Sequence, residues 1–530
     1  MSARTFLLVY PEFPDTYWSY RHALKFIGKK ALMPPLGLAT VAAMLPEGVE
    51  CNLVDMNIEP LRSRDIAEAE LVMISAMIVQ KDSVLEIISR CRAADVPVAL
   101  GGPYATSCHG DIEGVDYFIL GEGEITLPRF LADYEAGKPA PTYHTDERPD
   151  ISLAPIPRFD LLKMDYYDTL PLQYSRGCPF DCEFCDIVHL FGHKPRTKSP
   201  DQFIAELDAA HAVGFTGAVF IVDDNFIGNR REVKLLLARL AAWQKEHGHP
   251  YHISTEASID LAEDDELLQL MVEAGFSMVF IGIESPVADS LAGAGKKQNL
   301  RRDVRESIRK IQELGIEVTG GFIIGFDTDP PDIFDLQIEF IKELAIPTAM
   351  VGLLMALPNT RLYERLLREG RILSASTGNN THQAELNFTP KLPRDFLLAG
   401  YRRVLGAIYD PRTYFNRCLE VLRRYPHTPE ETTTSMKQPI QLREVTGFIR
   451  SLLRQTFSSY GIHYLRYLFS AVRLRPALVV RIITMAIQGH HYFTITRRAE
   501  RAAPAHAQNR FRQAIGRDTI TAGIGNQADA

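Results

Sequence analysis

The segment Arg176-Gly-Cys-Pro-Phe-Asp-Cys-Glu-Phe-Cys185 carries three cysteines with the spacing C-x3-C-x2-C. One loop of this kind can present three thiolates to three of the four irons of a [4Fe–4S] cluster, which leaves one iron without a cysteine ligand. An iron without a protein thiolate can bind a small molecule. We therefore predict Cys178, Cys182 and Cys185 as the ligands of a [4Fe–4S] cluster.

A zinc site and a disulfide framework are the alternatives to a cluster at these cysteines. A structural zinc site needs four ligands, and a C-x2-C pair usually has a matching pair downstream, whereas the only later cysteine is Cys418. His189 or His193 lies near enough in the chain to complete a Cys3His zinc site. A disulfide framework fits less well, because three clustered thiols cannot pair off in a long chain with no secretion signal.

The cysteine spacing, with the aromatic Phe184 directly before the last cysteine, resembles the signature of the radical S-adenosylmethionine (SAM) enzymes. The resemblance covers roughly Met164 to Pro390 and implies a partial (β/α)6 barrel over residues 160–390. In that family the open iron chelates the amino and carboxylate groups of SAM, and electron transfer then cleaves SAM to methionine and a 5′-deoxyadenosyl radical. A reducing electron donor such as a flavodoxin or a ferredoxin is implied as a partner.

Apolar runs that we expect to form the barrel strands recur through this region. The first of them leads into the cysteine loop, and active sites of β/α barrels lie at the carboxyl ends of the strands. The predicted strands are Leu170–Tyr174, Gly217–Val222, His252–Glu256, Met278–Glu284 and Val318–Gly325.

Several of these strands end in acidic residues or glycine, and the resemblance implies roles for them in binding SAM. By position, Asp223 and Asp224 would hold the amino group of SAM and Glu256 its ribose. Glu284 would lie on the same rim, and the strand that ends at Gly325 would pass close to the adenine. The alternative for each single carboxylate is a solvated strand end or a helix N-cap.

Residues 1–150 alternate short β-rich runs with helical ones, which is the pattern of a doubly wound α/β domain with a parallel sheet. The predicted strands are Thr5–Tyr10, Cys51–Asp55, Leu71–Ser75, Val96–Leu100 and Tyr117–Leu120. Ligands of such sheets bind beyond the carboxyl ends of the strands. Glycines mark this edge at Gly101-Gly102-Pro103 and at Gly121-Glu122-Gly123-Glu124, where a backbone without side chains can approach a ligand closely. Tight turns with no ligand are the alternative.

With Met33-Pro-Pro-Leu-Gly37 and the two glycine turns directly before a radical SAM core, this region looks like the Rossmann-like cobalamin-binding domain of B12-dependent radical SAM proteins. The resemblance implies cobalamin as a cofactor, with Asn57, Gly101, Gly102, Gly121 and Glu122 at its site. The better-known cobalamin motif D-x-H-x-x-G supplies a histidine to the cobalt, and Asn57 stands where that histidine would be. Either cobalamin binds without a histidine ligand, which we expect, or the domain has lost the cofactor.

Residues 391–505 are predicted to form a helical C-terminal domain, and residues 506–530 a disordered tail. Leu397–Leu422 and Leu442–Leu453 have the pattern of amphipathic helices. The run from Tyr460 to Gln488 is strongly apolar and contains arginines but no acidic residue. A basic amphipathic helix can lie on an anionic membrane surface, whereas the alternative is a helical cap over the mouth of the barrel.

The composition of the chain is that of a multi-domain cytoplasmic enzyme. Its 530 residues are too many for a single core, and 46% hydrophobic with 23% charged residues are ordinary globular values. A net charge of −8 argues against general nucleic-acid binding. No stretch is predicted to span a bilayer, so any membrane contact would be peripheral to the inner membrane, through the C-terminal helices.

The function implied by these resemblances is a radical SAM methyltransferase that uses cobalamin to methylate an unactivated carbon. In layout and length the chain resembles the hopanoid C-2 methylases, which implies a lipid substrate. Two alternatives remain: a radical SAM oxidoreductase or cyclase without methyl transfer, and a non-catalytic iron–sulfur protein. The sequence assigns no catalytic side chain beyond the cofactor ligands.

Overall fold

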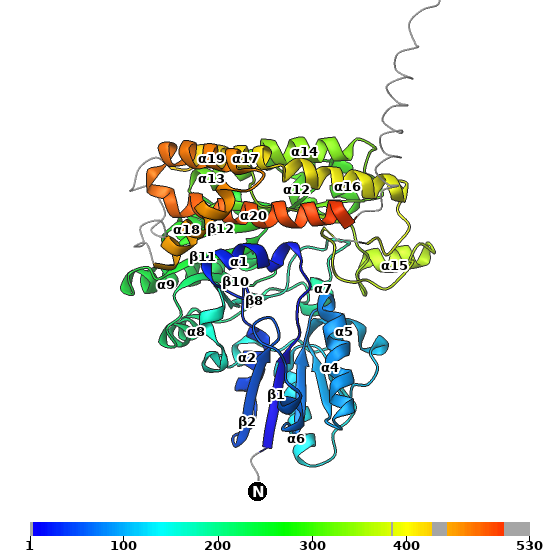
Figure 1. Ribbon diagram of the computed structural model, residues 1–530. Helices are drawn as coiled ribbons and strands as arrows, with labels where there is room; N and C mark the ends of the chain where they lie inside the picture. Colours follow the sequence, from blue (N-terminus) through cyan, green and yellow to red (C-terminus); the bar gives the residue numbers. More distant parts are fainter. Residues whose placement is uncertain (1–3, 383–384, 427–441, 503–530) are drawn as a thin grey trace, which may run out of the picture.

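The computed structural model describes residues 4–382, 385–426 and 442–502. Figure 1 shows an α/β domain from the N-terminal part of the chain, a second sheet with its helices in the centre, and a layer of C-terminal helices on the other side. The tail predicted for residues 506–530 lies outside the described residues. The predicted fold class, an α/β chain with a Rossmann-like domain, a partial barrel and a helical C-terminal part, is confirmed.

The first sheet is parallel and has the strand order β2-β1-β3-β4-β5-β6. Its central strands are continuous apolar runs, which a sheet covered by helices on both faces requires. All five predicted strands are present within two residues of their predicted ends. The strands are β1 (Arg4–Tyr10), β2 (Val49–Asp55), β3 (Leu71–Ser75), β4 (Val98–Gly101), β5 (Tyr117–Ile119) and β6 (Thr142–Tyr143). The flanking helices include α2 (Leu36–Ala43), α4 (Lys81–Ala93), α5 (Gly102–Cys108) and α6 (Gly123–Glu135).

The second sheet is also parallel, and its six strands follow one another in chain order, so that it forms an open half barrel. Its strands are β7 (Thr169–Leu172), β10 (Gly217–Ile221), β11 (Tyr251–Ala257), β12 (Phe276–Glu284), β13 (Glu317–Ile324) and β14 (Ala349–Leu353). The last strand was not predicted from the sequence. The outer helices are α8 (Pro200–Ala212), α9 (Arg230–Glu246), α10 (Asp265–Glu273), α13 (Val304–Glu313) and α14 (Ile333–Glu343).

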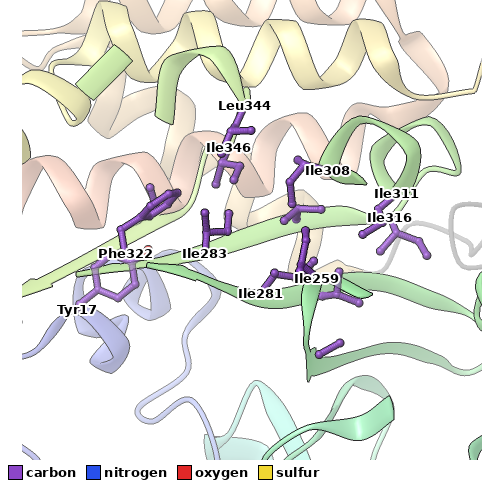
Figure 2. Close-up of a cluster of buried hydrophobic side chains, with 14 of the residues drawn as sticks. Tyr17, Ile259, Ile281, Ile283, Ile308, Ile311, Ile316, Phe322, Leu344 and Ile346 are labelled. Atoms are coloured by element: carbon purple, nitrogen blue, oxygen red, sulfur yellow. The ribbon is translucent and has the colours of Figure 1, made fainter. Parts of the chain in front are cut away.

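The alternation of side chains along these strands separates a packed outer face from an inner face. On β12, Val279, Ile281 and Ile283 are fully buried, while the intervening residues are only partly covered. Figure 2 shows Ile281 and Ile283 with Ile308 of α13 in the outer core. Because side chains on a strand alternate with a period of two, the partly covered residues all point to the concave side of the half barrel.

Five C-terminal helices form the third layer: α16 (Arg394–Ile408), α17 (Pro411–Arg424), α18 (Leu442–Thr456), α19 (Gly461–Leu474) and α20 (Val479–Ala502). The helix predicted over Leu397–Leu422 is divided in two. Pro411 begins α17, and the Asp410 carboxylate accepts a hydrogen bond from the Thr413 backbone N–H at 3.0 Å, so a new N-terminus is capped there. In the part of the chain that the structure describes, no helix is long and apolar enough to cross a bilayer.

The first turn of α20 packs against the amino ends of the half-barrel strands, which is the end opposite to the mouth that a cap was expected to cover. Arg481 of α20 forms an ion pair with Glu317, the first residue of β13, and also donates to the carbonyl of Ser277 near the start of β12. Both residues lie at the amino ends of their strands. The carboxyl ends face the first domain instead.

Candidate functional site

The three cysteines lie in the loop between β8 (Ser175–Arg176) and α7 (Ile187–Phe191). β8 pairs antiparallel with β9 (Arg196–Thr197), so the two ends of the loop are held together. Gly177 has a φ of +99°, and a Cβ there would come within 2.9 Å of the carbonyl oxygens of Gly192 and Lys194. Glycine is therefore required for the chain to enter the loop at this point.

Neighbouring segments form hydrogen bonds and an ion pair with the cysteine loop. The backbone N–H of Glu183 donates to the carbonyl of Ala294 at 2.9 Å, and its carboxylate pairs with Arg365 of α15 (Arg361–Arg368) at 2.6 Å. Arg361 donates to the carbonyl of Asp181 at 2.6 Å. The loop is thus positioned by backbone and ionic contacts that do not involve the cysteine side chains.

The thiols suit a cluster better than a single ion. Burial raises the pKa of all three cysteine thiols, and coordination by iron removes those protons outright. Within residues 4–382, 385–426 and 442–502, no three His, Cys, Asp or Glu side chains are spaced to hold one metal ion. Each thiolate of a cubane binds a separate iron, so convergence on one point is not needed. His189 and His193 are exposed, and the zinc alternative is not supported.

A buried ion pair lies directly beside the cysteines. Lys296 Nζ is 2.8 Å from Glu284 Oε1, and both side chains are almost completely covered. The neighbouring Gln298 places its Nε2 atom 3.9 Å from Cys182 Sγ. Sequence reasoning missed Lys296, because it follows a short helix far from the cysteines in the chain. Glu284 is at the predicted rim, but its carboxylate is engaged by Lys296.

Of the two aspartates that follow β10, only one reaches the interior of the half barrel. The Asp223 carboxylate accepts hydrogen bonds from the backbone N–H groups of Tyr174 and Ser175, at 2.8 and 2.9 Å, and from the Ser175 hydroxyl at 2.7 Å. It therefore holds the chain that leads into the cysteine loop. Asp224 accepts from the Gly177 backbone N–H at 3.0 Å and lines the cavity described next.

The concave side of the half barrel is the wall of a cavity of about 1440 Å³ that extends into the first domain. At the carboxyl ends of the strands it is lined by Asp224, Glu256 and Arg176. Burial raises the pKa of the Glu256 carboxyl to about 7 and that of Asp224 to about 6. Gly325, also predicted for this rim, lies outside the cavity lining, and its backbone N–H donates to Asp329 at 2.7 Å.

The glycine turns of the first domain line the opposite wall of the same cavity. Gly102 has a φ of +84°, and a Cβ there would approach the Ser75 hydroxyl to 2.6 Å, so this turn tolerates only glycine. Gly101, Gly121 and Glu122 also line the cavity. The carboxyl edge of the first sheet and the carboxyl edge of the half barrel thus face each other across one space, as two stacked cofactors require.

Two buried arginines connect the glycine turn with the cysteine loop. Arg176, two residues before Cys178, pairs with Glu122 at 2.8 Å and with Glu124 at 2.8 Å. Arg196 pairs with Glu122 at 2.7 Å. All four side chains are at least 85% covered. Glu122 therefore bridges the domains in addition to lining the cavity.

Asn57 lines the cavity, but its side chain is fully engaged by the protein. Its Nδ2 atom donates to Asp55 Oδ1 at 2.7 Å and to the carbonyl of Pro11 at 3.2 Å, and its Oδ1 atom accepts from the Phe13 backbone N–H at 2.9 Å. None of the cavity-lining residues that the described part of the first domain contributes is a histidine. A corrin held against this wall would find no histidine among the residues of the first domain that line the cavity.

Replacing Asn57 by alanine should leave the absorption spectrum of bound cobalamin unchanged. The variant loses three hydrogen bonds, at a cost of about 1–3 kcal/mol in the free energy of unfolding, but no cobalt ligand. The measurement is the visible spectrum of the reconstituted protein in its cob(II)alamin and cob(III)alamin states. A shift of the corrin bands in the variant would show that Asn57 reaches the cobalt after all.

Comparisons with known proteins agree with this geometry. Residues 172–341 match the model of the radical SAM superfamily, residues 30–131 the B12 binding domain, and residues 360–504 a domain of unknown function (DUF4070). An uncharacterized methyltransferase of Synechocystis is 43% identical over 92% of this chain and 91% of that protein. The hopanoid C-2 methylase of Rhodopseudomonas palustris is 33% identical over 96% of each chain.

Solved structures show the same fold. The radical SAM methyltransferase TsrM of Kitasatospora setae, determined with cobalamin and a [4Fe–4S] cluster, matches with a TM-score of 0.59 at 16% identity. The match covers 90% of this chain and 99% of that one. The order of Rossmann-like domain, half barrel and C-terminal region is therefore shared along almost the whole length.

Proposed function

Because the chain belongs to the family of cobalamin-dependent radical SAM methyltransferases that includes the hopanoid C-2 methylase, we propose that it methylates an unactivated carbon of a hopanoid-type lipid. The enzyme uses a [4Fe–4S] cluster, SAM and cobalamin. The methylases among its relatives give no support to a cyclase or oxidoreductase without methyl transfer. The observation that carries the lipid proposal is the shape and lining of the cavity.

The cavity is long. It follows the inner face of β10 from Gly217, at the amino end, to Val222, just beyond the carboxyl end. Five steps along a strand at about 3.3 Å each give roughly 16 Å. A long cavity with a chemically active end suits an extended, rigid substrate that reacts at one end.

The far end of the cavity is mainly apolar, with Arg21, Arg481, Thr484 and Gln488 as its polar members on α1 and α20. Beyond the amino ends of the strands its lining comes from α1 (Arg21–Ile27), α18 and α20 and includes Leu24, Ile27, Phe448, Val480, Ile483 and Ile487. Burying apolar surface contributes about 25 cal/mol per Å², so a fused-ring hydrocarbon would gain affinity along this whole wall. Of the acidic residues that line the cavity, Glu122, Glu124, Asp224 and Glu256 lie towards the opposite end, while Asp168 directly precedes β7.

The cofactors supply the radical that removes a hydrogen atom and the methyl group that replaces it. The protein has to hold them and orient the substrate between them. Cys178, Cys182 and Cys185 would hold the cluster. We assign Asp224 and Glu256 to the polar groups of SAM, because both line the cavity beside the cysteine loop. Asp223 would instead hold the backbone before the cysteine loop, and Glu284 would pair with Lys296. Gly325 would take part through its backbone hydrogen bond with Asp329.

Two further parts of the proposal concern what the enzyme meets in the cell. A small reducing protein of the flavodoxin or ferredoxin type would deliver electrons to the cluster. The enzyme would work in the cytoplasm and contact the inner membrane through its C-terminal helices, since a hopanoid resides in the bilayer.

The test is anaerobic reconstitution with iron, sulfide and cobalamin, followed by reduction in the presence of SAM and a hopanoid. We expect bound corrin, 5′-deoxyadenosine and a hopanoid that has gained one methyl group. Deoxyadenosine with corrin but without methylated lipid, across hopanoids that differ in their side chain, would reject the substrate class. Deoxyadenosine without corrin would reject methyl transfer by this route.

Placing a carboxylate in the apolar end, with Ile483→Glu, should lower kcat/KM for the lipid by roughly a hundredfold. The substrate would have to bind against a charge that lacks a partner. Formation of deoxyadenosine in the absence of lipid should be unaffected, because Ile483 lies at the end of the cavity away from the cysteines. Leu235→Glu, at an exposed position on α9, is the matched control and should behave as the unmodified enzyme. Equal kcat/KM in both variants would remove the apolar end from the substrate site.

A further inference from the structure

Two neighbouring helices carry apolar stripes on their outer sides. Ile449 and Leu453 of α18 and Phe457, directly after its last residue, are exposed and spaced by four. On α19 the exposed residues Ile462, Leu465 and Phe469 are spaced by three and four. This spacing places each set along one side of its helix. Phe457 is 86% exposed and Phe469 is 73% exposed. We call these six residues the outer stripe; Figure 1 shows both helices at one end of the helical layer.

The charged residues of the segment that carries the outer stripe have one sign. From Val445 to Ala499 the sequence contains no aspartate and no glutamate. Exposed arginines accompany the stripe on both helices, at Arg450 and Arg454 on α18 and at Arg466 and Arg473 on α19. Arginine forms forked hydrogen bonds with phosphate oxygens, and a basic helix with an apolar side is attracted to anionic lipid surfaces.

The outer stripe lies beside an opening of the cavity. Val445 of α18 is 42% exposed and also lines the cavity, and Ala477, just before α20, is likewise both exposed and lining. Phe448 lines the interior one turn further along α18, whereas the next residue, Ile449, belongs to the outer stripe. One helix therefore presents apolar residues to the cavity on one side and to the surroundings on another.

We infer that the outer stripe docks on an anionic phospholipid bilayer, and that the lipid passes from the bilayer into the cavity between α18 and the start of α20. This inference rests on the lipid substrate proposed above. Phe457 and Phe469 would enter the boundary between head groups and acyl chains, and the four arginines would contact lipid phosphates. The substrate would move from one apolar environment to another without crossing water, which removes the cost of exposing its rings.

The first test is sedimentation of the full-length protein with phosphatidylcholine vesicles, made with and without phosphatidylglycerol. We expect binding that needs phosphatidylglycerol and weakens as salt is raised, because exposed charges are screened. The double variant Phe457→Glu/Phe469→Glu should bind at least about tenfold more weakly, since two aromatic side chains no longer enter the bilayer. Leu367→Glu, at a position on α15 that is 57% exposed, is the matched control and should bind as the unmodified protein.

The second test separates docking from chemistry. Methylation is measured with the lipid embedded in vesicles and with the same lipid delivered by cyclodextrin. We expect the double variant to lose activity on vesicles and to keep it with cyclodextrin. Neither Phe457 nor Phe469 lines the cavity, so the reaction itself should be unaffected.

Vesicle binding by the double variant equal to that of the unmodified protein would overturn the inference. The inference would also be overturned if the unmodified protein did not bind vesicles but formed a dimer, and the double variant were a monomer. The outer stripe would then be an interface with a second copy of the chain. The unmodified protein could fail to methylate the lipid in either form of delivery while the double variant still loses vesicle binding. That result would support the docking surface and reject the proposed substrate.

Discussion

Replacing Cys182 by alanine should abolish both cluster assembly and SAM cleavage. Two thiolates remain in the variant, and two cannot hold a [4Fe–4S] cubane in a site that offers three. The loop itself should keep its position, because its backbone is held by hydrogen bonds with Ala294 and Arg361 and not by the cysteine side chains. The measurements are iron and sulfide per protein, the visible absorption of the cluster, and 5′-deoxyadenosine after reduction with SAM.

Cys418→Ala is the matched control. Cys418 is fully buried in α17, in the helical layer, and does not line the cavity. Its loss should leave iron content and SAM cleavage unchanged. A Cys182→Ala protein with the full complement of iron and normal deoxyadenosine formation would refute the assignment of the three cysteines.

Removing the Glu122 carboxylate, with Glu122→Ala, should destabilise the chain by about 3–5 kcal/mol. The two buried guanidinium groups of Arg176 and Arg196 then face a single carboxylate, that of Glu124. Arg196 keeps hydrogen bonds only with the carbonyl oxygens of Pro149 and Phe191. The first domain should also retain less cobalamin, since the Gly121-to-Glu124 turn loses its fixed position. Denaturant unfolding gives the stability, and the corrin absorbance after gel filtration gives the retention.

Glu135→Ala provides the comparison, because Glu135 is exposed at the end of α6 in the same domain. An exposed substitution of this kind normally changes stability by no more than about 0.5 kcal/mol. Glu122→Gln keeps the shape without the charge and should fall between the two. If Glu122→Ala unfolds at the same denaturant concentration as Glu135→Ala, the ion pairs do not join the domains in the way proposed.

The parts of the fold that could be predicted are those recorded in local sequence. Continuous apolar runs identified β1 and β3, because a strand buried between helices is apolar at nearly every residue. The cysteine spacing is also a local pattern, and it indicated that the predicted cluster ligands share one loop. β14 was missed since Ala349-Met-Val-Gly-Leu353 is short and contains a glycine, which weakens a strand pattern.

Contacts between distant segments could not be predicted. Lys296 pairs with Glu284 beside Cys182 only because β12 brings a loop from more than 100 residues away, and nothing local distinguishes that lysine. The aspartates Asp223 and Asp224 are adjacent in sequence, yet one supports the backbone while the other lines the cavity. Arg481 and Glu317, which pair where α20 meets the amino end of β13, are likewise far apart in the sequence.

The bridge from Glu122 and Glu124 to Arg176 and Arg196 has a consequence for how such enzymes can be recombined. The acidic partners are encoded in the first domain and the basic ones on either side of the cysteines. A chimera that takes its first domain from another protein must import matching carboxylates or bury two unmatched guanidinium groups at the seam. A chimera should therefore keep all four residues together when it exchanges either domain.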